Sequence, residues 1–306
     1  MEDSTERKTA KLRAAVIGGA NMDICGSPTG ALVMRDSNPG RVTLRPGGVG
    51  RNIAHDLKLF GMEVSLITAL GGDMNGTMLQ NDCLRLDLDM TMSRILPDMR
   101  SSTYLYLTDE TGDMLAAVND MGITECITPE ALVPLMERIN GFDAVVADAN
   151  LPERTLQYLA ENCTAPMYAD AVSAAKAKRL LPLLPKLRML KPNMAEAETL
   201  TGKHTPEEAA AALLEAGVRQ VYISMGEHGI YAAEKDRAIR KEATKTTVVN
   251  CNGAGDAATA AIVYACTAGA GLEEAAAAAV RAGAITVASA ETNAEGLREV
   301  FTEERA

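Results

Sequence analysis

The sequence is poor in aromatic and basic residues, and each scarcity excludes a class of function. Aromatic side chains make up 3% of the 306 residues and tryptophan is absent, so the chain lacks the stacking platforms that bind single-stranded nucleic acid. The formal net charge of −11 is opposite in sign to what a protein that neutralises a phosphate backbone needs. We therefore expect no nucleic-acid partner. If the protein binds a phosphate ligand, local backbone dipoles and a metal ion must hold it.

Histidine and paired cysteine are also scarce. The three histidines, His55, His204 and His228, are far apart and form no H-E-x-x-H pattern. A serine hydrolase is disfavoured because G-x-S-x-G is absent as well. The six cysteines contain no C-x-x-C pair, so neither a zinc ribbon nor a redox motif is indicated. If the protein uses a general base, a carboxylate is the better candidate.

Long apolar segments are missing too. No uncharged apolar stretch of about 18 residues occurs, so we expect no membrane partner. The segment from Met1 to Lys11 is polar and lacks the apolar core of a secretory signal. The alanine-rich run 275–290 comes nearest to such an apolar stretch, but it contains Arg281, which favours a packed helix instead. These features predict a cytoplasmic protein with reduced cysteines.

The chain does contain apolar strand-like runs that alternate with helix-like runs. Predicted strands begin at Arg13 and span 144–147, 167–169, 187–190 and 220–224. Predicted helices span 153–161 and 173–184, and another begins at Met194. This alternation predicts an α/β fold with a central, mostly parallel sheet flanked by helices on both faces. Ligands bind such sheets at the carboxyl ends of the strands.

Short strand-like stretches interrupt this rhythm at 31–34, 41–44, 103–107 and 114–118. The turn signal from Asp109 to Gly112 predicts that the last two form a hairpin. We therefore predict one domain over 1–306 with a small inserted β-sheet lid, formed by about 31–46 and 103–119. A homodimer formed through the lid would cover its outer face.

The strongest local signal runs from Asn250 to Asp256, with the sequence N-C-N-G-A-G-D, and precedes a helix-like run over 257–270. Glycines at a helix start leave backbone N–H groups free at its positive end, where an anion binds. A carboxylate beside such a nest can take a proton from an attacking hydroxyl group. Asp256 is equally a common helix-capping residue type, which is the structural alternative.

Two further glycine-rich turns occur earlier. Gly47 to Asn52 leads into a helix predicted over 53–60, and a purely structural turn is the alternative there. Gly18 to Asp23 follows the first strand but lacks the G-x-G-x-x-G spacing, so a dinucleotide-binding oxidoreductase is disfavoured. The Asp23 carboxylate could instead accept hydrogen bonds from the vicinal hydroxyls of a sugar. No G-x-x-x-x-G-K-[ST] occurs, which excludes a P-loop.

Five ordered motifs resemble those of the ribokinase-like (PfkB) carbohydrate kinases. The resemblance covers the chain from Gly18 to about Asn293. The motifs are Gly47-Gly48-x-Gly50-x-Asn52-x-Ala54 with Gly61, Gly72-Asp73 with Gly76, Lys191-Pro-Asn193-x-x-Glu196, Ser224-x-Gly226-x-x-Gly229 and Asn250-x-x-Gly-Ala-Gly-Asp256. The resemblance implies a ribokinase-like fold and transfer of the γ-phosphoryl group of ATP to a primary hydroxyl group of a sugar or nucleoside.

The resemblance also implies a role for each matching residue. The catalytic base is Asp256, and the anion hole is formed by Gly253, Ala254 and Gly255. Sugar hydroxyls contact Asp23, Gly48 and Asn52. The ATP site contains Asn193, Ser224, Gly226 and Gly229, and Glu196 holds Mg²⁺ through water, because Mg²⁺ gives up its hydration shell reluctantly. Cys251 and Asn252 depart from the family pattern beside a monovalent-cation site, so the use of K⁺ stays open.

Additional strings resemble the pseudouridine kinases within this family, among them Asp36-Ser-Asn-Pro-Gly-Arg-Val42, Asp148-Ala-Asn-Leu151 and Asp170-Ala-Val-Ser-Ala-Ala-Lys176. This resemblance implies that Ser37 and Asn38 lie near a uracil ring, where an amide can pair with its edge. It also makes Lys176 a candidate substrate contact. The alternatives are another sugar or nucleoside, such as ribose, fructose or adenosine, or a non-catalytic sugar-sensing protein. For Asn38 the structural alternative is a simple β-turn.

Overall fold

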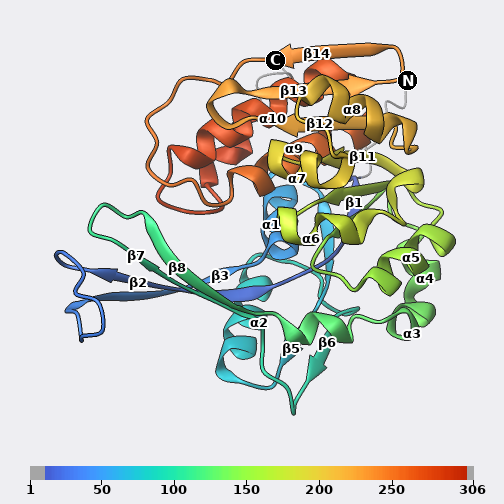
Figure 1. Cartoon of the computed structure of the whole chain (residues 1–306). Helices are drawn as coiled ribbons and strands as arrows, with labels where there is room; N and C mark the ends of the chain where they lie inside the picture. Colours follow the sequence, from blue (N-terminus) through green and yellow to red (C-terminus); the bar gives the residue numbers. More distant parts are fainter. Residues whose placement is uncertain (1–10, 302–306) are drawn as a thin grey trace, which may run out of the picture.

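The computed structural model describes residues 11–301, so the predicted polar segment from Met1 to Lys11 lies outside it except for Lys11. The centre is an eight-stranded sheet (Figure 1). In spatial order its strands are β14 (Arg237–Lys241), β13 (Ile230–Glu234), β12 (Gln220–Ser224), β11 (Leu187–Lys191), β10 (Met167–Asp170), β9 (Ala144–Asp148), β1 (Arg13–Ile17) and β4 (Glu63–Ile67). The six strands from β12 to β4 in this spatial order pair in parallel. Strands β13 and β14 add an antiparallel edge.

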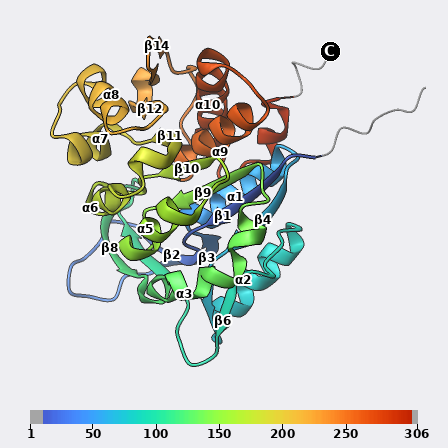
Figure 2. The same ribbon diagram turned by 90° about the vertical axis from the view of Figure 1, so that its right-hand side faces the viewer.

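Helices cover both faces of this sheet, as Figure 2 shows. One face packs against α1 (Val49–Leu59), α9 (Ala254–Thr267) and α10 (Leu272–Val287), and the other against α5 (Glu153–Asn162), α7 (Met194–Thr201) and α8 (Pro206–Glu215). Successive residues of β1 alternate between the two cores because side chains of a strand point to opposite faces: Ala14 and Val16 enter one, Ala15 and Ile17 the other. The predicted fold class is confirmed.

Shorter elements complete the core. The remaining helices are α2 (Met74–Arg85), α3 (Pro129–Leu132), α4 (Met136–Ile139) and α6 (Ala174–Ala177), and a separate two-stranded sheet pairs β5 (Ala69–Gly71) with β6 (Arg94–Leu96). The 3₁₀ helices are η1 (Gly122–Cys126), η2 (Val133–Leu135), η3 (Lys178–Leu180), η4 (Leu184–Lys186), η5 (Gly226–His228) and η6 (Glu295–Glu299). Within the described residues, no helix is long and apolar enough to cross a membrane.

One predicted helix is much shorter than expected. Over 173–184 the structure has α6, the 3₁₀ helix η3 and the first residue of the 3₁₀ helix η4. Pro182 and Pro185 lack a backbone N–H group and clash with the preceding turn, so the apolar periodicity cannot continue as an α-helix. By contrast, the glycine-led helices begin earlier than predicted, α1 at Val49 and α9 at Ala254.

A separate four-stranded sheet, named the lid below, projects from the core at the left of Figure 1. Its order is β3 (Gly40–Gly47), β2 (Asn21–Pro28), β7 (Thr103–Thr108) and β8 (Met114–Asp120). The predicted strand over 31–34 is wrong: these residues lie in the loop 29–39 that joins β2 to β3. Strand β2 was not expected because its sequence is rich in turn-forming residues, and pairing with β3 and β7 on both sides overrides that preference.

Candidate active site

Helix α9 begins where the chain turns sharply at Gly253, at the carboxyl edge of the main sheet. Gly253 has φ 83° and ψ −11°, a left-handed conformation that favours glycine. A Cβ atom there would lie 2.3 Å from the carbonyl oxygen of Thr292, so no side chain fits. The first N–H groups of a helix have no acceptor within the helix. The N–H groups of Ala254 and Gly255 therefore remain available to an anion in the adjoining cavity, which both residues line.

Asp256 lies in the first turn of α9 and contacts α1. Its Oδ2 atom accepts a hydrogen bond of 2.8 Å from Nδ2 of Asn52. Burial raises the pKa of Asp256 to about 7, and the nearby carboxylates of Asp170 and Asp148 act in the same direction. The hydrogen bond from Asn52 and the charge of Lys191 oppose this shift. A carboxyl group with a pKa near neutrality suits proton transfer at physiological pH.

A buried ammonium group lies beneath the start of α9. Lys191, at the end of β11, is 3% exposed, and its Nζ atom is 3.4 Å from Oδ2 of Asp170. The same Nζ atom is 3.7 Å from the position that a Cβ atom on Gly255 would occupy. Asp170 is held by a 2.6 Å hydrogen bond from Thr259. The sequence motif contains Lys191, but spacing did not reveal that its charge lies beside the glycine turn.

Asn193 and Glu196 form the capping box of α7. Asn193 N donates to Oε2 of Glu196 (2.8 Å), and Glu196 N donates to Oδ1 of Asn193 (2.9 Å). Asn193 also forms an isolated bridge with Ser224 at the end of β12. Both Glu196 oxygens already accept hydrogen bonds from Asn193, so they suit contact with Mg²⁺ through its waters. Among the described residues, no group of three or more His, Cys, Asp or Glu side chains that could hold a metal ion was found.

A cavity of about 960 Å³ opens beside the start of α9. Three predicted nucleotide contacts line it together with the glycine turn: Ser224, Gly226, Gly229, Ala254 and Gly255. Gly229 has φ 81°, and a Cβ atom there would lie 2.0 Å from the carbonyl oxygen of Lys241. Because Gly229 has no side chain, the backbone at the end of β14 can pack directly against it, beside the cavity.

The two early glycine turns pack backbone against backbone. Gly48 has φ 98°, and a Cβ atom there would lie 2.6 Å from the carbonyl oxygen of Gly19. The same oxygen accepts a hydrogen bond from Arg51 N (3.1 Å). Gly47 leaves space for Asp23, whose Oδ2 atom would be 2.2 Å from an added Cβ. Burial raises the pKa of Asp23 to about 6, against the lowering effects of Asn21 and Arg51.

A chain of hydrogen-bonded polar residues runs from these turns past the end of β9 to α6. Asp148 accepts hydrogen bonds from Gly19 N and Asn150 N, each 2.9 Å long. Nζ of Lys176 donates to Oδ1 of Asn150 over 2.6 Å. Burial lowers the pKa of Lys176, and the charge of Asp148 opposes this. Lys176 is thus not a solvated helix lysine.

Ser37 and Asn38 are not brought to this site. They lie in the loop 29–39 at the tip of the lid (Figure 1). Five residues of extended strand separate Asp23 from the tip, which corresponds to about 17 Å. The Asn38 amide is used inside the loop: Oδ1 accepts from Val33 N, and Nδ2 donates to Val33 O. The Asn38 side chain thus stabilises the loop from within, while residues 37–39 themselves adopt no turn.

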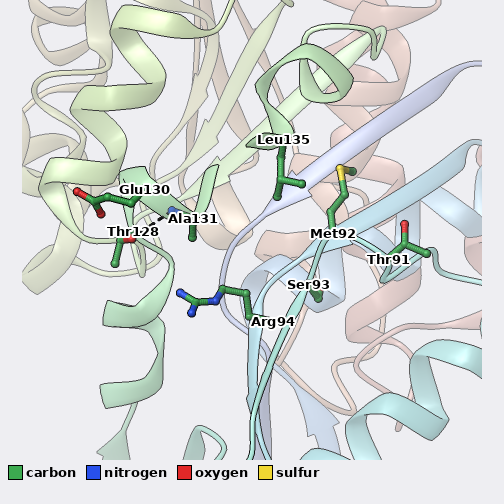
Figure 3. Close-up of a pocket in the computed structure, with 8 residues that line it drawn as sticks. All are labelled: Thr91, Met92, Ser93, Arg94, Thr128, Glu130, Ala131 and Leu135. Atoms are coloured by element: carbon green, nitrogen blue, oxygen red, sulfur yellow. Dashed lines mark hydrogen bonds between the residues drawn. The ribbon is translucent and has the colours of Figure 1, made fainter. Parts of the chain in front are cut away.

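A second depression, of about 590 Å³, lies between the start of β6 and α3 and is shown in Figure 3. Arg94, Thr128 and Glu130 are among its lining residues, and Arg94 donates to the carbonyl oxygen of Cys126 (2.8 Å). None of the predicted site residues lines it, so it plays no part in the chemistry considered below.

A helix start with N–H groups available to an anion, a carboxylate of raised pKa and a large neighbouring cavity together suit phosphoryl transfer from a nucleotide to a hydroxyl group. A family model described as pfkB family carbohydrate kinase matches residues 11–298. The chain belongs to this family and is a kinase of a sugar or nucleoside, a phosphotransferase with an alcohol acceptor. The family predicted from the sequence motifs is confirmed.

Individual relatives agree with this assignment. The chain is 38% identical to a pseudouridine kinase of Escherichia coli over 79% of its own length and 80% of that protein. It is 32% identical to the uncharacterized sugar kinase YeiI of the same organism, over 91% of this chain and 79% of that protein. Its fold matches a ribokinase from Thermotoga maritima with a TM-score of 0.85 and 22% identity, covering 96% of this chain and 100% of the other.

Proposed function

We propose that the protein is an ATP-dependent kinase that phosphorylates the 5′-hydroxyl group of pseudouridine to give pseudouridine 5′-phosphate. The observation that carries the proposal is the 2.8 Å hydrogen bond between Asn52 and Asp256. It joins the glycine turn proposed to bind the sugar to the helix start proposed to bind the moving phosphoryl group. The 38% identity to the E. coli pseudouridine kinase favours this substrate over another sugar.

In the proposed reaction the 5′-oxygen attacks the γ-phosphorus of ATP in line with the leaving oxygen of ADP. A new O–P bond forms, the bond to the β,γ-bridging oxygen breaks, and Asp256 takes the proton of the hydroxyl group. The N–H groups at Gly253, Ala254 and Gly255 stabilise the charge on the phosphoryl oxygens. Lys191 adds a fixed positive charge beneath them, close to Gly255.

The nucleotide is proposed to occupy the 960 Å³ cavity, where it contacts Ser224, Gly226 and Gly229. Asn193 lies next to this cavity through its bridge to Ser224, and Glu196 holds Mg²⁺ through water. When bound, Mg²⁺ neutralises charge on the phosphates. K⁺ is an optional further ligand in this proposal, beside Cys251 and Asn252, where Asn252 N donates to Oδ1 of Asn250 over 3.0 Å.

For the nucleoside, Asp23, Gly48 and Asn52 are proposed to contact the ribose hydroxyls. Asn150 and Lys176 are the proposed contacts of the base, because their hydrogen-bonded pair lies beside the glycine turns and offers both a donor and an acceptor. Contact between the base and Ser37 or Asn38 would require the tip of the lid to reach across the site, so the proposal does not depend on it.

Turnover of a substrate panel tests this proposal. We expect the purified protein with ATP and Mg²⁺ to release ADP rapidly with pseudouridine and slowly with uridine, ribose, fructose and adenosine. Lys176→Met should raise the KM for pseudouridine about tenfold through loss of a charged hydrogen-bond partner. Lys178→Met, an exposed neighbour, is the control and should leave KM unchanged.

Two outcomes contradict the proposal in different ways. Strong turnover of ribose without turnover of pseudouridine would overturn the substrate and leave the kinase assignment intact. Binding of pseudouridine with no turnover of any compound would indicate a non-catalytic sugar-sensing protein. An enzyme-coupled measurement of ADP, together with product analysis by mass spectrometry, distinguishes these outcomes.

The lid also supports a proposal on assembly, a homodimer formed through its outer face. Strand alternation places polar residues such as Asp23 on one face and apolar residues on the other. The exposed apolar side chains are Val42 (66%), Leu44 (46%), Leu105 (43%), Leu107 (44%) and Val118 (64%). Five such side chains on one sheet face form a patch typical of protein–protein contacts.

Substitution in the lid tests the dimer. We expect light scattering after size-exclusion chromatography to give twice the chain mass, and Val42→Lys to reduce it to the monomer, because a buried lysine charge disfavours association. Val248→Lys is the control, since Val248 is similarly exposed (62%) but lies outside the lid. A wild-type protein that elutes as a monomer at micromolar concentration would contradict the proposal.

A further inference from the structure

Arg51 lies directly before Asn52 in α1 and takes no part in the proposed phosphoryl transfer. It is 4% exposed, although arginine is rarely buried without a specific partner. Its guanidinium group contacts four side chains at once, one of them Nδ1 of His55, which lies 3.5 Å from Nη2. Nη2 donates to Oδ2 of Asp82 over 2.5 Å, and Nη1 donates to Oδ1 of Asn52 (3.0 Å) and Oδ1 of Asn293 (2.6 Å).

These contacts determine which way the Asn52 amide faces. A guanidinium group has only donors, so it must meet the oxygen of the amide and not its nitrogen. With Oδ1 held by Arg51, Nδ2 is directed at Asp256 and donates to its carboxylate over 2.8 Å. A rotated amide would place two donors against each other at Arg51 and an oxygen against the Asp256 carboxylate.

The environment holds Arg51 itself in place from two other segments. Asp82 belongs to α2, and its second oxygen accepts a hydrogen bond from Arg85 (2.8 Å) at the surface. Asn293 follows α10, and its Nδ2 donates to Asn52 O (3.2 Å) and to Oδ1 of the fully buried Asp56 (2.8 Å). Because the guanidinium group of Arg51 can only donate, its hydrogen bonds to Oδ1 of Asn52 and Oδ1 of Asn293 favour this arrangement of both amides.

We propose that Arg51 is a positioning residue that fixes the Asn52 amide in the orientation that donates to Asp256, with Asp82 and Asn293 holding its guanidinium group. The inference rests on the proposed function, in which Asp256 accepts the proton of the substrate hydroxyl group. In this proposal Arg51 acts only by orienting Asn52 and does not itself contact the substrate or the nucleotide.

The consequence of losing Arg51 depends on the charged groups around Asp256. They are Asp56 on α1, Asp148 and Asp170 at the ends of β9 and β10, and Lys191 at the end of β11. The hydrogen bond from Asn52 lowers the pKa of Asp256 against burial and these carboxylates. Freed to rotate, Asn52 no longer stabilises the charged form, so the base is protonated up to a higher pH.

Arg51→Met tests the proposal, with Arg85→Met as the matched control. Both remove a cationic partner of Asp82, and only the first releases Asn52. We expect Arg51→Met to move the acidic limb of the kcat profile up by about one pH unit, a shift typical of a lost hydrogen bond to a carboxylate. Its kcat should then fall about tenfold at pH 6 and much less at pH 9, with KM for ATP unchanged. Arg85→Met should keep the wild-type profile.

Arg51→Lys provides a second variant that retains the buried charge if Arg51→Met does not fold. A single ammonium group cannot hold three acceptors in fixed directions, so the same shift is expected. A fall in kcat that is equal at every pH, or an unchanged profile, would overturn the positioning role. Carboxyl NMR on the protein without ligand measures the pKa of Asp256 directly, and Asp256→Asn assigns the signal. Because this measurement requires no turnover, it tests the positioning role even if the proposed function is wrong.

Discussion

Replacement of Asp256 by asparagine is expected to lower kcat by about 10²–10⁴-fold, the contribution typical of a general base. Asparagine is nearly isosteric and can keep a hydrogen bond with Asn52, so the fold and the nucleotide cavity should persist. The KM for ATP and the melting temperature should therefore change little. Steady-state kinetics and a thermal melt of the same preparation measure both quantities.

The pH dependence of the wild-type enzyme provides an independent check on the same role. A group must be deprotonated to act as a base, and burial raises the pKa of Asp256 to about 7. The wild-type kcat should therefore fall as the pH decreases through about 7, while the residual activity of Asp256→Asn should lack this limb. Phosphoryl transfer that persists undiminished in the variant would exclude Asp256 as the base.

The second large effect is expected for Gly253→Ala. The added Cβ would lie 2.3 Å from the carbonyl oxygen of Thr292, so the turn must move and the N–H groups at the start of α9 move with it. Loss of one preorganised donor typically lowers kcat by about 10²–10³-fold. We expect a loss of this size, measured as kcat per folded molecule.

Gly269→Ala separates the anion site from backbone strain. Gly269 has φ 92°, close to the 83° of Gly253, but no atom lies within 4 Å of its added Cβ. Both variants should lose about 1–2 kcal/mol of stability, the cost of a left-handed alanine, and Gly253→Ala should lose more because its Cβ also clashes with Thr292. Only Gly253→Ala should lose activity. An equal loss of activity in both would mean that strain, and not the anion site, is responsible.

Features that depend on neighbouring residues in the chain could be predicted from the sequence. Apolar runs between turns located β9, β10, β11 and β12, because a strand that is buried on both faces needs only a short apolar segment. The helix over 153–161 was likewise confirmed as α5. The glycines at 48 and 253 indicated helix starts, and both adopt positive φ at those starts.

Predictions failed where pairing partners override local preference. Strand β2 contains Asn21, Gly26, Ser27 and Pro28, residue types that favour turns, and it forms only because β3 and β7 pair with it on both sides. Conversely, the apolar run 31–34 has no strand beside it, since the β2–β3 pairing ends at Pro28 and Gly40. Such outcomes depend on which segments meet, and local composition does not encode that.

The order and spacing of its motifs were enough to assign this chain to a family and to select Asp256, because a glycine-led helix start with a carboxylate is a local arrangement. Folding alone decided the environment of that carboxylate. Asn52 and Asp256 are 204 residues apart; Arg51 lies beside Asn52 on α1, while Asn293 and Lys191 come from a loop and a strand distant in the sequence. Hydrogen bonds and charges act over a few ångströms. Only the packing of distant segments therefore determines the pKa and orientation on which the proposed chemistry depends.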